Sequence, residues 1–566
     1  MYYGVLGESW GTYTIPADDF TTGENEVEIW VYWGEIYMDE AWTGEGEVEN
    51  SPPSVPSTPS PSNGAAITDQ TPQLSWLSTD ADNYDVYFGT TTNPPKVSSN
   101  QANNTYSPST LSVGQTYYWK VTAKNAYGST PGSLWSFSVI SDSPQTGVDF
   151  TSPYSGSYLL INNESENGNA TQYTGTLASA QRKEWASRNV QIPKGLPMDA
   201  YRIDPVPDRN MVLDRAKLVS RTEDTSRAVG DTRQFTVYNF KTDSDQSMTA
   251  TLQAEGQYCK IWVESVADIN TTKAQQVADE FDDVIYNQIT TNFYTPSDVN
   301  GDGKIAILIF DIQDNFDTTG GYVGGYFWSR DLFNMAGSNL MEIFYIDTYP
   351  TMHYPKSNPI DVSRAFSTLA HEFQHMVNFN RNYIVESSGE MSTWIDEGLS
   401  MAAERLVYGP SVVQSRVSYY NSSPGVRDGH SLLYWDDYGE TLANYALSYI
   451  FMQYFRIQMA QGTGIYREII TDYANDYRCI QNALDDYASS IAFGDFLTNW
   501  RIAMAINEST GEYGFKGDSS FNSIQTPLYT GGNKNLRGGG AIVKTLSSSF
   551  TDPGNSGVDI QYVGLP

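Results

Sequence analysis

The strongest chemical signal in this sequence of 566 residues is the pattern H-E-x-x-H, formed by His371, Glu372 and His375. Residues four positions apart lie on one face of an α-helix, so both imidazoles can reach one metal ion. Glu372 then stands beside the ion, where a carboxylate accepts the proton of a metal-activated water without ligating the metal. We therefore expect a zinc site, which needs a third protein ligand and an open position for water.

The segments around this pattern have the periodicity of helices. Asn358 is a candidate N-cap with Pro359 at the first helical position. Apolar residues then recur at helical spacing, at positions Val362, Phe366, Leu369, Phe373 and Val377. A second helix with an apolar stripe is expected after Ser392, another candidate N-cap. The third ligand is expected on this second helix.

Three stretches of the chain resemble the gluzincin peptidases, and hyicolysin-type neutral metallopeptidases in particular. They are His371-Glu-Phe-Gln-His-Met-Val-Asn-Phe379, Trp394-Ile-Asp-Glu-Gly-Leu-Ser-Met-Ala-Ala-Glu404, and Gly324-Gly-Tyr-Phe-Trp328 with Met341-Glu-Ile-Phe-Tyr-Ile-Asp347. The resemblance covers residues 150–510 and implies a thermolysin-like α+β fold. It also implies Glu397 as the third zinc ligand and Glu404 as a carboxylate that orients a ligand imidazole. A solvated position on the helix surface is the alternative for Glu404.

The donor that stabilises the oxyanion is also implied by the resemblance. In gluzincin aminopeptidases a tyrosine does this from the start of a helix with the pattern Y-x-x-G. Tyr445-Ala-Leu-Ser448 is similar, with Ser in place of Gly, which implies Tyr445 as the donor. A packed core aromatic is the alternative for Tyr445, and Tyr434 and His430 are rival donors. Tyr449 is expected to face the core.

The activity implied by the resemblance is zinc-dependent endopeptidase cleavage of protein or peptide substrates. An aminopeptidase of the same clan is one alternative, although such enzymes normally carry a G-x-M-E-N strand, of which Met341-Glu342 keeps two letters. An adhesin or binding protein with an inert peptidase fold is the other alternative. The intact H-E-x-x-H pattern argues against an inert site.

A second metal is a weaker prediction. Asp298, Asn300 and Asp302, with Gly303 after them, match the first half of a calcium-binding loop. The acidic residue expected at the twelfth position is replaced by Ile309, although Asp311 is close by. The alternative to calcium binding is a turn that leads into a buried strand at residues 305–310.

The chain is expected to be multidomain, with β-sandwich modules followed by an α+β gluzincin metallopeptidase domain. The predicted units are a small β unit (1–47), a Pro/Ser linker (48–62), a fibronectin type III-like β-sandwich (63–142), a β-rich domain (145–268), the catalytic domain (269–510) and a β-rich C-terminal segment (511–566).

The sandwich prediction depends on short alternating strands at residues 63–142 and on a resemblance to fibronectin type III domains. The segment from Leu111 to Tyr117 resembles their tyrosine corner, and Trp135-Ser-Phe137 resembles their closing strand. Such β modules are usually spacers or binders of a surface, carbohydrate or protein partner.

Charge and hydropathy narrow the classes of partner. The formal net charge is −34, from 67 acidic and 33 basic residues, so phosphate backbones are poor partners. No segment has the length of apolar residues that a membrane span needs. A secreted or cell-surface bacterial protein is expected. The first residues show no signal peptide, so we expect the chain to start inside a longer precursor. The sequence has two cysteines, Cys259 and Cys479, and their spacing leaves open whether they form a disulfide bond.

Overall fold

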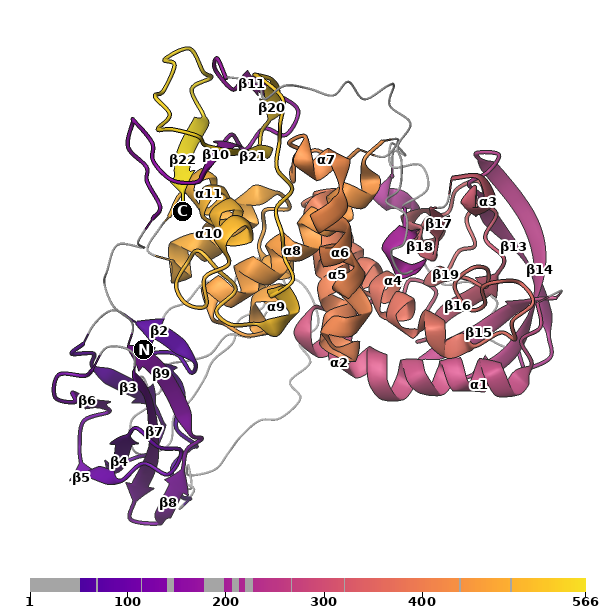
Figure 1. The fold of residues 1–566 in the computed structure, drawn as a ribbon. Coiled ribbons are helices and arrows are strands. Elements are labelled where there is room, and N and C mark those ends of the chain that lie inside the picture. The colour runs from indigo at the N-terminus through magenta and orange to yellow at the C-terminus, as the bar shows by residue number, and fades with distance from the viewer. Residues whose placement is uncertain are drawn as a thin grey trace, which may run out of the picture.

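The computed structural model describes residues 51–67, 70–112, 115–139, 147–177, 198–205, 213–218, 227–265, 267–319, 321–436, 439–488 and 491–566. The predicted small β unit at 1–47 lies outside these residues. Several sheets occupy the N-terminal region and most helices follow in the C-terminal region (Figure 1). The chain is therefore multidomain.

The first described unit consists of two sheets that share a buried aromatic core. One sheet has the order β1-β3-β6 and the other has β2-β9-β7-β4-β5, with β8 paired to β7. Trp76, Trp119 and Trp135 are buried between them. The Tyr117 hydroxyl accepts a hydrogen bond from the backbone N–H of Ser112 at 2.9 Å, which is the contact of a tyrosine corner. The strands are β1 (Ser57–Ser60), β2 (Ala65–Ile67), β3 (Leu74–Leu77), β4 (Asn83–Gly89), β5 (Lys96–Gln101), β6 (Thr105–Tyr106), β7 (Gln115–Asn125), β8 (Gly128–Pro131) and β9 (Trp135–Val139).

The predicted Pro/Ser linker (48–62), of which the structure describes residues 51–62, contains a strand. Ser57 and Ser60 pair with β3, and the Ser54 N–H donates to Thr79 O at 3.1 Å. β1 forms an edge of its sheet. Proline is tolerated there because one side of an edge strand makes no ladder bonds, so a Pro-rich segment can still be a strand.

The largest sheet outside the first unit, called the main sheet below, has six strands. Its order is β13-β14-β15-β16-β19-β18, with parallel pairing of β15, β16 and β19 and antiparallel pairing elsewhere. The predicted strand at 305–310 is confirmed, since all six residues of β16 are buried. The strands are β13 (Thr232–Asn239), β14 (Ser244–Glu255), β15 (Cys259–Glu264), β16 (Ile305–Phe310), β18 (Gly325–Phe327) and β19 (Ile343–Asp347).

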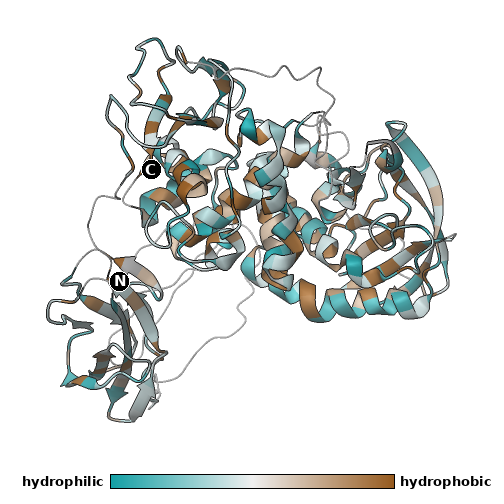
Figure 2. Cartoon of the chain, in the orientation of Figure 1, coloured by the Kyte–Doolittle hydropathy of each residue, from teal (hydrophilic) through white to brown (hydrophobic). Residues whose placement is uncertain are grey.

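Side chains of the main sheet alternate between two cores. Ile307 and Phe344 join the large core that the helices complete, whereas Leu308 and Tyr345 join a smaller core on the other face. A strand buried on both faces is a continuous apolar run, as in β16. Residues 241–247, at the turn of the β13–β14 hairpin, are polar and exposed (Figure 2).

Helices cover the large-core face of this sheet (Figure 1). The helix with the H-E-x-x-H pattern, α4, does not begin at Asn358 and Pro359 as predicted. A 3₁₀ turn at Val362–Ala365 precedes it, and Asp361 caps that turn through the N–H of Ser363. The helices are α1 (Thr271–Glu280), α2 (Tyr286–Asn292), α3 (Phe316–Thr319), α4 (Phe366–Phe379), α5 (Thr393–Tyr408), α6 (Gln414–Ser422), α7 (Pro424–Arg427), α8 (Thr441–Met459), α9 (Gly464–Thr471), α10 (Tyr477–Tyr487) and α11 (Phe493–Ile506).

The predicted β-rich domain at 145–268 is not a separate unit in the described residues. β10 (Tyr158–Asn163) lies between β21 (Ala541–Thr545) and β22 (Ile560–Leu565), and β11 (Thr171–Tyr173) pairs with β20 (Asn535–Arg537). β12 (Arg202–Ile203) pairs in parallel with β17 (Tyr322–Val323), and β13 to β15 belong to the main sheet. The partners of these strands are distant in sequence, so local patterns do not identify them.

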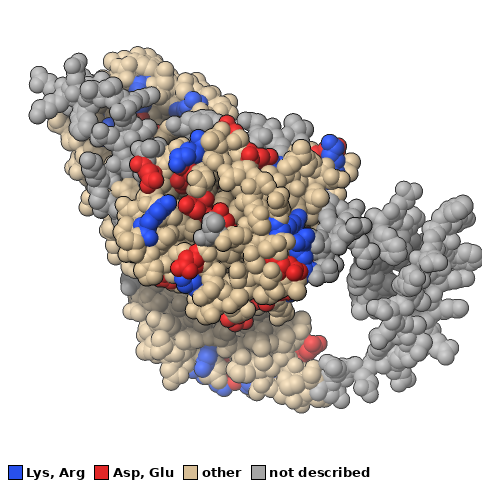
Figure 3. Space-filling view, turned by 90° about the vertical axis from the view of Figure 1, so that its right-hand side faces the viewer, with Lys and Arg blue, Asp and Glu red and all other residues tan. Residues whose placement is uncertain are grey.

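Three further observations concern the whole described chain. Cys259 and Cys479 are buried and free. Among the described helices, none is both long and apolar enough to cross a membrane. Acidic and basic side chains are interspersed over the face shown in Figure 3, so this face offers a phosphate backbone no continuous basic stripe.

The central position of β10 leads us to predict that the protein is less stable without this strand. A chain of residues 178–566 leaves β21 and β22 without the strand that joins them, whereas a chain of 140–566 keeps it. We expect the shorter chain to unfold at a temperature lower by about 5 °C or more and to aggregate through its open strand edges. Differential scanning calorimetry and gel filtration check this. Equal unfolding temperatures would contradict the three-strand arrangement.

Candidate metal centre

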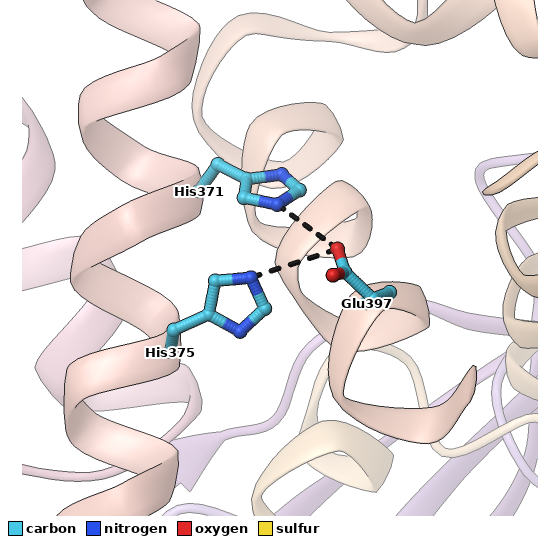
Figure 4. Close-up of side chains that lie close together, drawn as sticks. All are labelled: His371, His375 and Glu397. Carbon is cyan, nitrogen blue, oxygen red and sulfur yellow. Dashed lines mark hydrogen bonds and ion pairs between the residues drawn. The ribbon is translucent and has the colours of Figure 1, made fainter. Parts of the chain in front are cut away.

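His371 and His375 project from α4 toward Glu397 of α5 (Figure 4). Their Nε2 atoms lie 3.3 Å and 3.6 Å from the same carboxylate oxygen, Glu397 Oε2. Zinc bonds of about 2.0–2.1 Å place neighbouring ligand atoms of a tetrahedral site roughly 3.3 Å apart. The spacing of these three predicted ligands therefore fits a zinc ion, and all three residues are buried.

Each imidazole is oriented by a carboxylate on its other nitrogen. His371 Nδ1 lies 2.8 Å from Glu404 Oε1 and His375 Nδ1 lies 2.8 Å from Asp396 Oδ2. Such contacts fix the ring, so that Nε2 would be free to bind a metal ion. Glu404 is fully buried, so the solvated alternative for this residue is wrong. Asp396 was not predicted, and its only sequence signal is its position directly before Glu397.

Glu372 lies beside the candidate ligands without a partner of its own. Its side chain is buried, and neither carboxylate oxygen has a hydrogen-bond partner among the described residues. A buried carboxylate without a partner is costly. Such a carboxylate could accept a hydrogen bond or a proton from a bound water molecule or from a substrate.

The electrostatics of the centre favour a cation. Burial raises the pKa of Glu372 to about 8, and the charge of Asp204 adds to this. Burial lowers the pKa of His371, but Asp204 and Glu397 outweigh it and raise that pKa to about 9. Burial raises the pKa of Glu397, but the two imidazoles hold it well below its ordinary value. The carboxylates thus concentrate negative charge where a metal ion would sit.

Two residues that the sequence did not single out, Arg202 and Asp204, complete the centre. Arg202 Nε donates to Asp204 Oδ2 at 2.8 Å, and its Nη2 forms an ion pair with Glu404. Asp204 Oδ2 lies 3.7 Å from His371 Nε2. Asp204, His371 and Glu372 form a second group that could hold a metal ion. No local motif surrounds these two residues, which are held at the site by contacts with segments distant in sequence: the pairing of β12 with β17, the ion pair with Glu404 and the hydrogen bond to Tyr445.

Tyr445 is the one of the proposed donors that contacts the centre. Its hydroxyl donates to Glu397 Oε1 at 3.1 Å and accepts from the N–H of Asp204 at 3.0 Å. His430 instead contacts Asn444 at 2.9 Å, and Arg537 stacks on the ring of Tyr434. Tyr449 is buried in the helical core, as expected.

The predicted calcium loop gains no support from its side chains. Lys260 Nζ forms an ion pair with Asp302 at 2.9 Å. Asp298 and Asn300 accept hydrogen bonds from backbone N–H groups of the same loop. This arrangement is that of the alternative, a turn that leads into β16.

A cavity of about 150 Å³ opens beside His375. A volume of this order accommodates one benzene-sized group. Phe327, Phe379 and Met391 form its apolar walls, and Asn378 and Asp396 are among its polar ones. Of the three candidate ligands, His375 lines this cavity, which has room for a side chain.

The contact of Glu404 with His371 leads us to predict that zinc affinity depends on this carboxylate. Glu404→Gln removes the charge that holds both His371 and Arg202, so we expect zinc affinity to fall by about 10- to 100-fold. A competitive titration with a chromophoric chelator measures this. Glu468→Gln, a change on the distant helix α9, is the matched control. Unchanged affinity in Glu404→Gln would show that this carboxylate does not orient a ligand.

Comparison with known proteins agrees with the geometry. No protein-family model matches the chain. Two solved structures match short parts at 19% identity: FN3tt mut over 16% of this chain and 97% of that chain, with a TM-score of 0.13, and the twitchin kinase region from C. elegans over 18% and 19%, with a TM-score of 0.14. The neutral metalloprotease ShpI of Staphylococcus hyicus is 34% identical over 412 residues, which are 71% of this chain and 92% of that protein. The chain therefore belongs to the family of neutral metalloproteases that includes ShpI.

Proposed function

We propose that this metalloprotease is a zinc-dependent endopeptidase of the gluzincin type, with His371, His375 and Glu397 as ligands. The observation that carries the proposal is the placement of a buried, unpartnered Glu372 beside three ligand atoms that lie at zinc-ligand spacing. Two nitrogens and one carboxylate oxygen are a common donor set of catalytic zinc, which keeps a further position open.

Glu372 is the general base in this proposal. Zinc, when bound, supplies a Lewis acid that polarises a carbonyl and lowers the pKa of water. Glu372 accepts the proton of the attacking water and passes it to the leaving amine. Its burial supports this role, because a carboxylate without hydrogen-bond partners holds a proton more readily than a solvated one.

Tyr445 is the proposed donor to the oxyanion. Its hydroxyl lies at the centre and is held against Glu397, and its ring packs against Trp435 and the guanidinium of Arg416. These contacts fix the position of the hydroxyl, whose proton would turn from Glu397 to the substrate oxygen as charge develops there.

Internal cleavage is favoured over cleavage from the amino terminus by the position of Glu342. In the aminopeptidase alternative a glutamate at this point of the motif grips the substrate amine. Here Glu342 Oε1 accepts from Ser297 Oγ at 2.7 Å and from the N–H of Val299, at the start of β19. This carboxylate is thus engaged with the loop before β16. Secretion or display at the bacterial cell surface is part of the proposal, and the acidic composition is compatible with it.

The proposal predicts that Glu372→Gln abolishes casein hydrolysis while zinc stays bound. Loss of a general base lowers kcat by about 10²- to 10⁴-fold, whereas the ligand set is unchanged. Hydrolysis of labelled casein and zinc content by atomic absorption are measured on the same samples. Activity that survives in the zinc-loaded variant would eliminate Glu372 as the base.

A pair of peptides separates internal from terminal cleavage. We expect a peptide with an acetylated amino terminus to be cleaved at least as fast as its unblocked counterpart, because an endopeptidase does not need the free amine. Mass spectrometry of the products identifies the cleaved bond. Release of single amino-terminal residues from the unblocked peptide alone would identify an aminopeptidase instead.

A further inference from the structure

Residues 202–204 contact three groups of the centre that a substrate would need. The Asp204 carboxylate lies against His371 Nε2, at 3.7 Å, and in one group with Glu372. The backbone N–H of Asp204 donates to the Tyr445 hydroxyl at 3.0 Å. The N–H of Gly325 donates to Asp204 Oδ1 at 3.1 Å. The segment therefore contacts the proposed oxyanion donor and the edge strand, and its carboxylate lies within 4.8 Å of the base.

The same segment lies beside the edge of the main sheet, where it pairs with β17 and accepts a hydrogen bond from Gly325 of β18. β18 is the last strand of that sheet, and a free strand edge is a common binding place for an extended peptide. The N–H of Gly324 donates to Ile203 O at 3.1 Å, and β12 runs parallel to β17. Residues 203 and 204 thus accept the hydrogen bonds of two consecutive N–H groups, those of Gly324 and Gly325.

Charge pairing holds the segment in this place. The guanidinium of Arg202 bridges Asp204 and Glu404, and all three side chains are buried. A buried ion pair stays in place because removal of one partner leaves an uncompensated charge. With the segment there, the exposed fractions of His371 and Glu372 are both 0%. The base and this ligand are thus closed to a substrate carbonyl in this arrangement, and Asp204 is one of the groups that lie against them.

We propose that residues 202–204 are an internal ligand of the catalytic centre and that the protein in this form is latent. The proposal rests on the proposed function, because it takes this centre to be the peptidase site. The alternative for Asp204 is a constant part of the working site, like Glu404. The two readings predict opposite effects on turnover when the segment is displaced.

The chain offers a variant that displaces the segment without removing a charge. A Cβ added to Gly324 would lie 2.6 Å from Arg202 Cδ and 3.0 Å from Asp204 Oδ1, so Gly324→Ala forces these two residues away. Asp204→Ala removes the carboxylate itself. Asp199→Ala, in the 3₁₀ turn at Met198–Tyr201, is the matched control from the same segment.

The test measures access to the metal separately from catalysis. Each protein is loaded with cobalt, which binds nitrogen and oxygen sites of this kind, and is titrated with acetohydroxamate by visible absorption. We expect Gly324→Ala and Asp204→Ala to bind the probe about tenfold or more tightly than the parent, with Asp199→Ala unchanged. With zinc, the first two variants are expected to hydrolyse casein faster than the parent.

The outcomes are distinct. Parent-like probe affinity in both variants, with circular dichroism that shows them folded, overturns the proposal. Tighter probe binding with slower casein hydrolysis in both variants also overturns it, because Asp204 is then part of the working site. Tighter binding with no casein hydrolysis in any protein, the parent included, supports an internal ligand and contradicts the endopeptidase function.

Discussion

The Glu404 carboxylate joins the parts of the molecule that make the centre. It accepts from His371 on α4, it pairs with Arg202 of β12, and it projects from α5, the helix that carries Glu397. Burial raises the pKa of Glu404, but Arg202 and His371 lower it to about 2, so the group stays ionised. Removal of one partner from such a buried pair costs about 3–5 kcal/mol. The positions of three elements are therefore coupled through one side chain.

That coupling explains how so many charges are tolerated in the core. Glu397, Glu404, Asp204 and Arg202 are all buried, and each has a partner of opposite charge or a hydrogen-bond donor within the centre. Glu372 is the exception, because its oxygens have no partner among the described residues. Stability alone would favour an apolar residue at this position, which agrees with the proposed role of Glu372 in the reaction.

The sequence was informative where function depends on local spacing. His371 and His375 are four positions apart on one helix and Glu372 is next to His371, so their geometry follows from the helical repeat. The helix start was misplaced because Asn358 and Pro359 carry the usual signals, yet Asp361 makes the cap. Glu397 and Glu404 were identified through resemblance to gluzincin peptidases, and the structure brings both against His371.

What sequence reasoning missed depends on contacts between distant segments. Arg202 contacts Glu404 across 202 positions, and β10 lies between strands that begin more than 370 residues later. The spacing of apolar residues within one segment does not identify such partners, because the register of a strand also depends on the strand with which it pairs. This is also why 145–268 was predicted as a domain: its strands are real, but their partners belong to the peptidase region and the C-terminal segment. Residues 202–204 are likewise held at the candidate metal centre by contacts with residues that are distant in sequence. A strand of two residues, such as β12, gains little stability from its backbone hydrogen bonds. Its place at the centre therefore depends on the ion pairs of Arg202. In our proposal, loss of those ion pairs would free the edge formed by β17 and β18 for a substrate.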